Sequence, residues 1–139
     1  MHKRIGGVLA ALVVIAGLVA AQPLVARAAE IDGTWRTEHG WLVRIAPCGA
    51  ARCGKVMGGT SMRDKYNPNP ALRQRKVVGI RLMWGLRKQG GSYKGKLYNP
   101  KDGKTYVGYV KPLSASAIKL SGCILGGLLC RSQTWKRVK

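Results

Sequence analysis

Along most of the chain, hydrophobic and polar residues alternate with a period of two in short runs, which is the pattern of half-buried β-strands. In the run 77–84, for example, Ile80, Leu82 and Trp84 are spaced two residues apart, and Arg81 lies between them. Glycine, proline, asparagine and aspartate bound the runs, and these residues favour turns. The pattern predicts eight short strands, at 33–37, 41–46, 54–57, 77–84, 93–98, 105–110, 118–123 and 129–138.

The order of these runs predicts an all-β fold. The runs follow one another closely enough to form consecutive hairpins, and none of them has the spacing of an amphipathic helix. A single antiparallel up-and-down barrel of about eight strands would leave no open edge, and it has room for packed side chains or one small ligand. Gly79, Gly95, Gly108 and Gly122 fall inside predicted strands, where a closing sheet needs bends or bulges. A two-sheet sandwich is the alternative.

One long connection begins at 58–59 and leads to the strand predicted at 77–84, so it interrupts the series of strands. It carries two Asn-Pro steps, and proline cannot donate to a ladder of hydrogen bonds. Asn69 can cap a short helical turn at 70–75. Connections of this length inside a small domain are usually lids or binding loops. The alternative is a packed crossover, held by an ion pair between Asp64 and an arginine of the Arg-x-Arg at 73–75.

The chain begins with a segment that has the layout of a secretory signal peptide. A basic start precedes an apolar run at 5–21, and a small-x-small cleavage site follows at 26–28. A transmembrane anchor is the alternative, which the glycines of the run disfavour. We therefore expect a signal-peptide helix at 1–28, cleavage after Ala28 and one exported domain at 29–139, either periplasmic or secreted.

The exported domain is strongly basic. The full chain has a formal net charge of +20, and removal of 1–28 leaves 22 Lys and Arg against 5 Asp and Glu, a charge of +17. Such an excess favours anionic partners at the cell envelope, although basic residues scattered along a chain also serve solubility. Nucleic acid is not an expected partner, because the leader predicts export.

Four cysteines follow the leader, at Cys48, Cys53, Cys123 and Cys130. Export would place them where disulfides persist. Cys123 and Cys130 are symmetric about residues 126–127, so a two-residue turn there would place them opposite each other at about 5.5 Å between Cα atoms. Cys48 and Cys53 are symmetric about residues 50–51. We predict the pairs 48–53 and 123–130; a four-thiolate zinc site is the alternative, which the spacing disfavours.

Several ordered motifs together resemble the bacterial domain-of-unknown-function family 2147. They are Pro-Cys-Gly-x-x-x-Cys-Gly-Lys-Val at 47–56, Asp-x-x-Asn-Pro at 64–68, Leu-Arg-x-Arg at 72–75, Val-Gly-Ile at 78–80, Tyr-x-Gly-x-Leu-Tyr-Asn-Pro-x-Asp-Gly-Lys-Thr-Tyr at 93–106, Gly-Cys-x-Leu-Gly-Gly at 122–127 and Gln-Thr-Trp-x-Arg at 133–137. The resemblance covers nearly all of 33–138. It implies an exported lipocalin-like barrel that binds a small, mostly apolar molecule.

The segment Gly-Thr-Trp at 33–35 is similar to the start of lipocalins. There the tryptophan closes one end of the barrel, and a basic side chain from near the C-terminus stacks on it. The resemblance therefore implies a structural contact between Trp35 and Arg137, with Lys136 as the second candidate partner.

The predicted function is binding of a small amphiphilic or apolar, anionic ligand such as a fatty acid or lipid. The candidate ligand-binding residues are Asp64, Asn67, Arg73 and Arg75 for a polar head, and Ile80, Leu82, Trp84, Tyr93 and Tyr106 for an apolar body. The other candidate walls are Val43, Ile45, Met57, Leu97 and Ile118. Any one of these apolar side chains could instead fill a solid core.

Catalysis has little support in the sequence. His39 is the only histidine after the leader, and on a strand it would point away from the side of its neighbour Glu38. We expect no enzyme, no cofactor and no metal. The alternative function is that of a basic structural or adhesive envelope protein, which binds polyanions through its charge and encloses no ligand.

Overall fold

The structure is a computed structural model that describes Gly17 and residues 31–139. Only Gly17 of the predicted signal peptide at 1–28 is among the described residues, and the predicted cleavage site lies outside them. No helix in this part of the chain combines the length and the apolar character of a membrane span.

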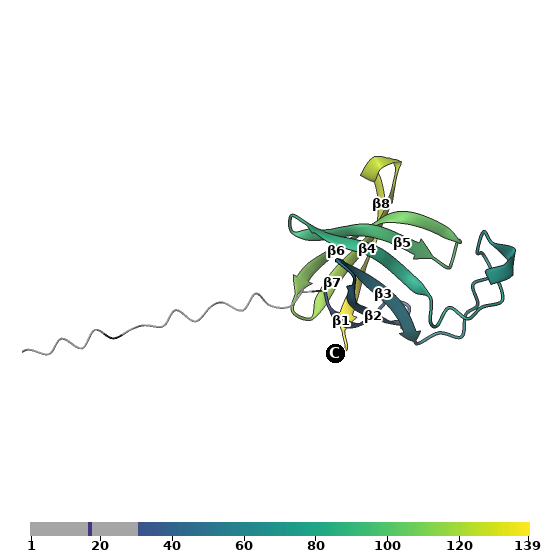
Figure 1. The fold of residues 1–139 in the computed structure, drawn as a ribbon, viewed down its shortest axis with the longest axis horizontal. Helices are drawn as coiled ribbons and strands as arrows, with labels where there is room; N and C mark the ends of the chain where they lie inside the picture. The colour runs from purple at the N-terminus through teal and green to yellow at the C-terminus, as the bar shows by residue number, and fades with distance from the viewer. Residues whose placement is uncertain (1–16, 18–30) are drawn as a thin grey trace, which may run out of the picture.

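Eight antiparallel strands pair in sequence order and close into one barrel, so the predicted architecture is confirmed (Figure 1). The last strand returns to pair with the first, which excludes the sandwich. The strands are β1 (Gly33–Arg36), β2 (Leu42–Cys48), β3 (Ala51–Gly58), β4 (Arg81–Gln89), β5 (Ser92–Asn99), β6 (Lys104–Ser114), β7 (Ala117–Ile124) and β8 (Leu129–Arg137). Two single 3-10 turns, η1 (Pro70–Leu72) and η2 (Leu125–Gly127), lie between strands.

The up-and-down order places the connections alternately at the two ends of the barrel. We call the end with the β2–β3, β4–β5 and β6–β7 turns the closed end. The open end holds the β1–β2, β5–β6 and β7–β8 turns and the long β3–β4 connection. The period-two pattern decides which side chains point inward: Val43 and Ile45 on β2 are buried, whereas Arg44 between them is exposed.

Trp35 and Arg137 reinforce the seam between β1 and β8, which consists of only two residue pairs. The guanidinium carbon of Arg137 lies 4.2 Å from the centroid of the fully buried Trp35 ring. Arg137 Nη1 also donates to the carbonyl of Asp32 at 2.7 Å, and its Nε donates to the carbonyl of Ala115 at 2.7 Å. A cation–π contact of this kind contributes on the order of 0.5–2 kcal/mol. Arg137, and not Lys136, therefore makes the stacking contact.

The predicted start of the fourth strand, at residue 77, is wrong. The chain turns at 77–80, where the amide of Ile80 donates to the carbonyl of Val77 at 3.0 Å and Gly79 has φ +97°. β4 begins only at Arg81, so Gly79 does not lie inside a strand. The predicted end of the second strand, at residue 46, is also wrong, because β2 continues through Pro47 to Cys48. β1 pairs along β2 only as far as Ile45, so Pro47 lies where β2 has a single neighbour and its missing N–H is tolerated.

Both predicted disulfides are present, but the turns that carry them differ from the prediction. Cys123 and Cys130 lie directly opposite each other with Cα atoms 4.1 Å apart, and the turn between them is the four residues 125–128 instead of a Gly-Gly pair. Cys48 pairs in the ladder with Ala51, so the disulfide from Cys48 to Cys53 runs diagonally across the strands with Cα atoms 5.8 Å apart. The turn is shifted because Gly49 adopts φ +63° and occupies its first position.

The β3–β4 connection is a folded arm that projects beyond the barrel (Figure 1). Its two sides pair with each other through the Arg63↔Lys76 bridge, and the amide of Asp64 donates to the carbonyl of Arg75 at 3.0 Å. The predicted helical turn is present in a shorter form at Pro70–Leu72, and the Asn69 side chain accepts from the amide of Ala71 as predicted.

The arm is packed against the β5–β6 turn at Gly103. A Cβ placed on Gly103 would lie 1.8 Å from the carbonyl oxygen of Tyr66, and Gly103 has φ +72°. Gly90, in the β4–β5 turn, has a similar φ of +60° but nothing within 4 Å of its Cβ position. Only glycine therefore satisfies both the turn and the contact at position 103.

We expect Gly103→Ala to destabilise the protein more than Gly90→Ala. Both variants bear the cost of a positive φ, and only the first must also push the arm away from the turn, which costs roughly 1–3 kcal/mol in addition. Chemical denaturation of the two variants measures the difference. Equal losses would show that the arm is not held at this contact.

Candidate ligand-binding cavity

A cavity of about 630 Å³ occupies the open end of the barrel, within the usual size range of small-molecule sites of about 300–1,000 Å³. Its walls come from two of the connections at that end, β1–β2 and β5–β6, and from the five strands β4 to β8. The lining residues are Thr37, Glu38, His39, Trp41, Leu82, Leu97, Tyr98, Asn99, Pro100, Lys101, Asp102, Tyr106, Leu120, Gly122, Ile124, Leu129, Arg131, Ser132, Gln133 and Trp135.

The deep part of the cavity is apolar. Leu82, Leu97, Leu120 and the two tryptophans Trp41 and Trp135 are buried side chains that line it. The indole N–H of Trp135 is satisfied because it donates to the side-chain oxygen of Gln133 at 3.0 Å. The floor therefore offers a surface that favours an apolar group.

Gly122, one of a row of three glycines, keeps this space open. Gly95, Gly108 and Gly122 face one another across β5, β6 and β7. A Cβ on Gly122 would lie 3.3 Å from Cδ2 of Leu97 and 3.6 Å from Cβ of Tyr106, both of which line the cavity. Any larger side chain at position 122 would therefore project into the space between those two walls.

The rim of the cavity is polar and carries two cations. Lys101 lies in the β5–β6 turn and Arg131 on β8, and neither side chain has a hydrogen bond or ion pair to another described residue. Asp102 is already engaged: it accepts from the amide of Lys104 at 2.9 Å and from the hydroxyl of Tyr106. The hydrogen bond to Asp102 raises the pKa of Tyr106, so that side chain is neutral at ordinary pH. The rim thus offers two cations that form no ion pair, while its carboxylates already accept hydrogen bonds from the protein.

Glu38 and His39 also line the cavity, from the β1–β2 turn. One carboxylate oxygen of Glu38 accepts from the amide of Thr134 on β8 at 2.9 Å. Glu38 therefore ties the β1–β2 turn to β8.

The predicted apolar site residues are divided between the cavity and the packed interior. Leu82 and Tyr106 line the cavity, and so does Leu97. Ile80 and Tyr93 are buried in the core, and Trp84 packs against it. The remaining predicted walls, at Val43, Ile45, Met57 and Ile118, do not line the cavity either.

None of the predicted polar site residues lines the cavity, because they hold the arm together instead. The Asp64 carboxylate is fully buried. It accepts from the Tyr98 hydroxyl at 2.5 Å, from the Asn67 amide at 2.8 Å and from Arg75 Nε at 2.9 Å. Arg73 Nε donates to the carbonyl of Asn67 at 2.8 Å. The ion pair between Asp64 and one arginine of the Arg-x-Arg is the alternative that the sequence left open.

Tyr98 joins this network to the cavity. It lies at the end of β5, its side chain is 7% exposed, and it lines the cavity while donating to Asp64. Burial, and then the hydrogen bond to Asp64, raises the pKa of Tyr98 to about 12. The buried carboxylate thus fixes the position of one wall of the cavity.

The charged and aromatic lining residues that sequence reasoning missed include three on β8 and one in the β5–β6 turn. Arg131, Gln133 and Trp135 alternate along β8, and this period of two was the available signal that they share a face. Lys101 lies between the predicted strands 93–98 and 105–110, among turn-forming residues that gave no indication of a binding site.

Comparisons with known proteins agree with this geometry. A protein from Helicobacter pylori, HP1028, whose structure is described as belonging to the lipocalin family, superposes with a TM-score of 0.71 at 29% sequence identity. The match covers 81% of this chain and 85% of the Helicobacter chain. A search among curated proteins found no significant match.

The closed antiparallel barrel with a cavity at one end places the protein in the class of lipocalin-like barrels, a ligand-binding fold. A family model described as "Uncharacterized protein conserved in bacteria (DUF2147)" matches residues 33–137. The chain belongs to this family, as the resemblance of its motifs indicated.

We expect Tyr98→Phe to remove the last tyrosine ionisation on an alkaline titration. Because the folded-state pKa of Tyr98 lies above its usual value of 10, the neutral phenol stabilises the fold fully below about pH 10. This contribution is lost as the pH rises through about 12. Absorbance of the phenolate band follows the ionisation of the five tyrosines.

Tyr66→Phe is the matched control. Tyr66 is half-exposed, so this substitution removes one phenol that lies outside the Asp64 network. Unfolding measured in parallel should show the stability advantage of the wild type over Tyr98→Phe shrinking between about pH 10 and pH 12. An unchanged titration curve in Tyr98→Phe would contradict the assignment.

Proposed function

We propose that this protein is an exported binding protein for a small amphiphilic anion, such as a fatty acid or a lipid with one anionic head. The observation that carries the proposal is a cavity of about 630 Å³ with a buried apolar floor and unpaired cations at its rim. An acyl chain would lie against the tryptophans and leucines, and its head would remain at the open end.

The head group is assigned to Arg131 and Lys101. Both line the cavity rim, and neither forms an ion pair with a carboxylate of the described residues. A guanidinium presents paired donors to a carboxylate or phosphate, and the lysine adds a point charge. This assignment replaces Arg73 and Arg75, whose Nε atoms donate within the arm.

The proposal places the protein in the periplasm or outside the cell, in keeping with its two disulfides. The proposed function is to bind the ligand without converting it chemically. Extraction of a bound fatty acid ester after long incubation should return the ester intact, and mass spectrometry of the extract measures this.

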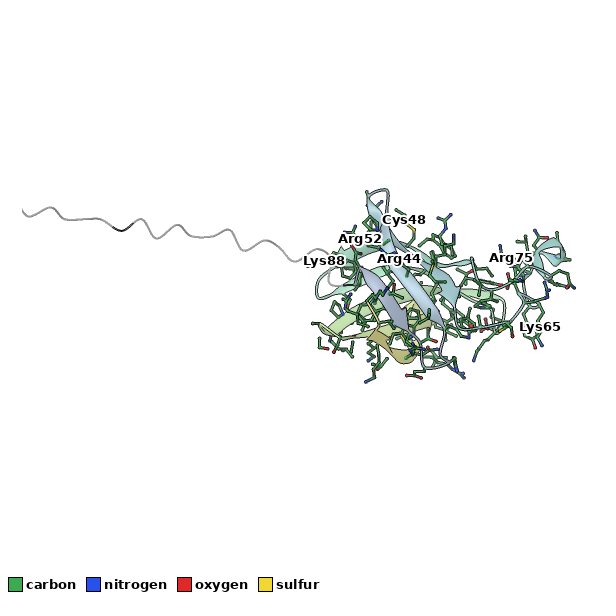
Figure 2. All side chains as sticks on the ribbon, turned by 90° about the horizontal axis from the view of Figure 1, so that it is seen from below. Arg44, Cys48, Arg52, Lys65, Arg75 and Lys88 are labelled. Carbon is green, nitrogen blue, oxygen red and sulfur yellow. A yellow bond between two sulfur atoms is a disulfide. The ribbon has the colours of Figure 1, made fainter. Side chains whose placement is uncertain are left out.

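Polyanion binding through net charge is the second candidate. Its support is the excess of basic over acidic side chains. Among the described residues, carboxylates form ion pairs with two of the basic side chains, those of Arg52 and Arg75. Figure 2 shows basic side chains at both ends of the molecule, with Lys88 and Arg52 on one side and Lys65 and Arg75 on the other. Salt separates the two functions, because polyanion binding weakens steeply with ionic strength whereas burial of an acyl chain does not.

We expect Gly122→Val to weaken binding of a fluorescent fatty acid by at least about tenfold, because the new side chain fills the cavity between Leu97 and Tyr106. The neighbours that its Cβ would meet are side-chain atoms at 3.3 Å or more, so the fold should accommodate it. Gly91→Val is the control, since Gly91 lies in the β4–β5 turn at the closed end with nothing within 4 Å. Full binding by Gly122→Val would exclude this cavity as the site.

Native mass spectrometry of the protein from its own host provides an independent measurement. A bound mass that disappears on denaturation is the expected result. A ligand-free mass, combined with no displacement of the fluorescent fatty acid, would overturn the proposal.

We expect Arg131→Gln to weaken binding of a fatty acid about tenfold or more, as loss of a charge-assisted hydrogen bond does. Binding of the uncharged methyl ester should be unchanged, since it offers no anionic head. Arg87→Gln is the matched control, because Arg87 is an exposed arginine of β4 outside the cavity. An equal loss for acid and ester would show that Arg131 acts through packing and not through its charge.

A further inference from the structure

The tip of the β7–β8 hairpin exposes an unusual group of apolar side chains. Ile124, Leu125, Leu128 and Leu129 are 43%, 69%, 89% and 56% exposed, and they fall within six consecutive residues. They are four of the nine large hydrophobic residues that are exposed in the described part of the chain. We call these four residues the apolar tip. Soluble proteins rarely present such a cluster without a partner.

The apolar tip is held out from the barrel. Figure 1 shows the end of the hairpin projecting beyond the body of the protein. The disulfide between Cys123 and Cys130 joins its two strands directly below the tip. Leu125 has φ +54°, a left-handed conformation that costs a residue with a Cβ about 1 kcal/mol or more. The hairpin therefore has a leucine at a position where glycine or asparagine would adopt this backbone conformation at lower cost. Residues in such strained backbone conformations are concentrated at functional sites.

Basic side chains lie beside the apolar tip. Lys101 and Lys104 lie at the β5–β6 turn, at the same end of the barrel as the tip, and Arg131 is on β8 close to it. Arg131 follows the second cysteine of the hairpin. The acidic neighbours at the open end are already engaged, Glu38 with the amide of Thr134 and Asp102 with Tyr106. The surroundings of the tip therefore complement an anionic surface.

We propose that the apolar tip docks the protein on an anionic lipid bilayer. Leucine and isoleucine side chains enter the boundary between head groups and acyl chains, and Lys101, Lys104 and Arg131 contact the lipid phosphates. Apolar insertion and electrostatic attraction act together in this mode, and each alone is weak. A bilayer fits better than a protein partner because the tip is small and convex. Binding of such a tip requires only an apolar layer to enter and a negatively charged surface, and an anionic bilayer offers both.

Docking by this tip would also orient the cavity. Ile124 and Leu129 belong both to the tip and to the lining of the cavity. The open end of the barrel would therefore face the lipid boundary. The docking inference stands on exposure and charge and does not require the proposed ligand, so the two are tested separately.

The test is cosedimentation of the processed protein, its N-terminus verified by intact mass, with vesicles of phosphatidylcholine containing about one third phosphatidylglycerol. The critical variant is Leu125→Asp/Leu128→Asp, and the matched control is Leu113→Asp. Leu113 is also an exposed leucine, at 51%, but it lies near the β6–β7 turn at the closed end. The wild type, the double variant and the control share the same N-terminus, and their net charges differ by at most two.

We expect the wild type and Leu113→Asp to bind these vesicles, and the double variant to bind at least about tenfold more weakly, as loss of two inserted leucines predicts. Pure phosphatidylcholine vesicles or high salt should weaken wild-type binding. Near-ultraviolet circular dichroism checks that each variant is folded. Leu128→Trp provides a second measurement, since its fluorescence should be quenched by lipids brominated along the acyl chain.

Other results would overturn the proposal. Equal binding by the wild type and the double variant would show that charge alone attracts the protein to lipid. Absence of wild-type binding to the anionic vesicles would exclude the bilayer. A dimer in sedimentation velocity that the double variant abolishes, without vesicle binding by the wild type, would assign the tip to a second copy of the chain. Fatty acid displacement measured without vesicles reports on the cavity alone. Failure of the proposed ligand binding can therefore be distinguished from failure of the docking proposal.

Discussion

The structure depends on closure of the barrel at a short seam. β1 is only four residues long and pairs with β8 through two residue pairs, whereas the other strands form longer ladders. Arg137 compensates for this by stacking on Trp35 while donating to backbone carbonyls on both sides of the closed end. The amides of Thr34 and Val138 add bonds across the same seam. Without closure, β1 and β8 would be open edges, and the interior would have no boundary.

The two ends of the barrel differ because their side chains differ. At the closed end, Trp35 and Ile118 are fully buried, and neither lines the cavity. Toward the open end, the glycine row of β5–β7 removes side chains from the interior, and the cavity lies beside it. The arm is anchored to the same end by the buried Asp64, which is satisfied by three donors and thereby avoids the cost of an unpaired buried charge. The cavity, its cationic rim and the apolar tip thus share one end of the molecule.

Errors in the sequence-based prediction have local physical causes. Both disulfides were predicted, yet one turn is shifted and the other is longer than predicted, because Gly49 and Leu125 adopt positive φ values that symmetry of the cysteines does not reveal. The start of β4 was misplaced because 77–80 alternates like a strand but folds as a turn against the arm. The polar residues of the arm were interpreted as a head-group site. Their composition fits that role, but their contacts with Tyr98, 31 or more residues away, could not be read from spacing.

The sequence by itself determined the all-β class, the up-and-down order of eight strands, the two cysteine pairs and the excess of positive charge. Those properties follow from alternation, turn residues and composition, which are local or additive. Only the tertiary structure decided which inward-facing residues fill the core and which surround a cavity, since that depends on how strands far apart in sequence meet around the barrel. It alone also revealed that Asp64 is internal, that Arg131 is at the rim and that the leucines of the last hairpin are exposed.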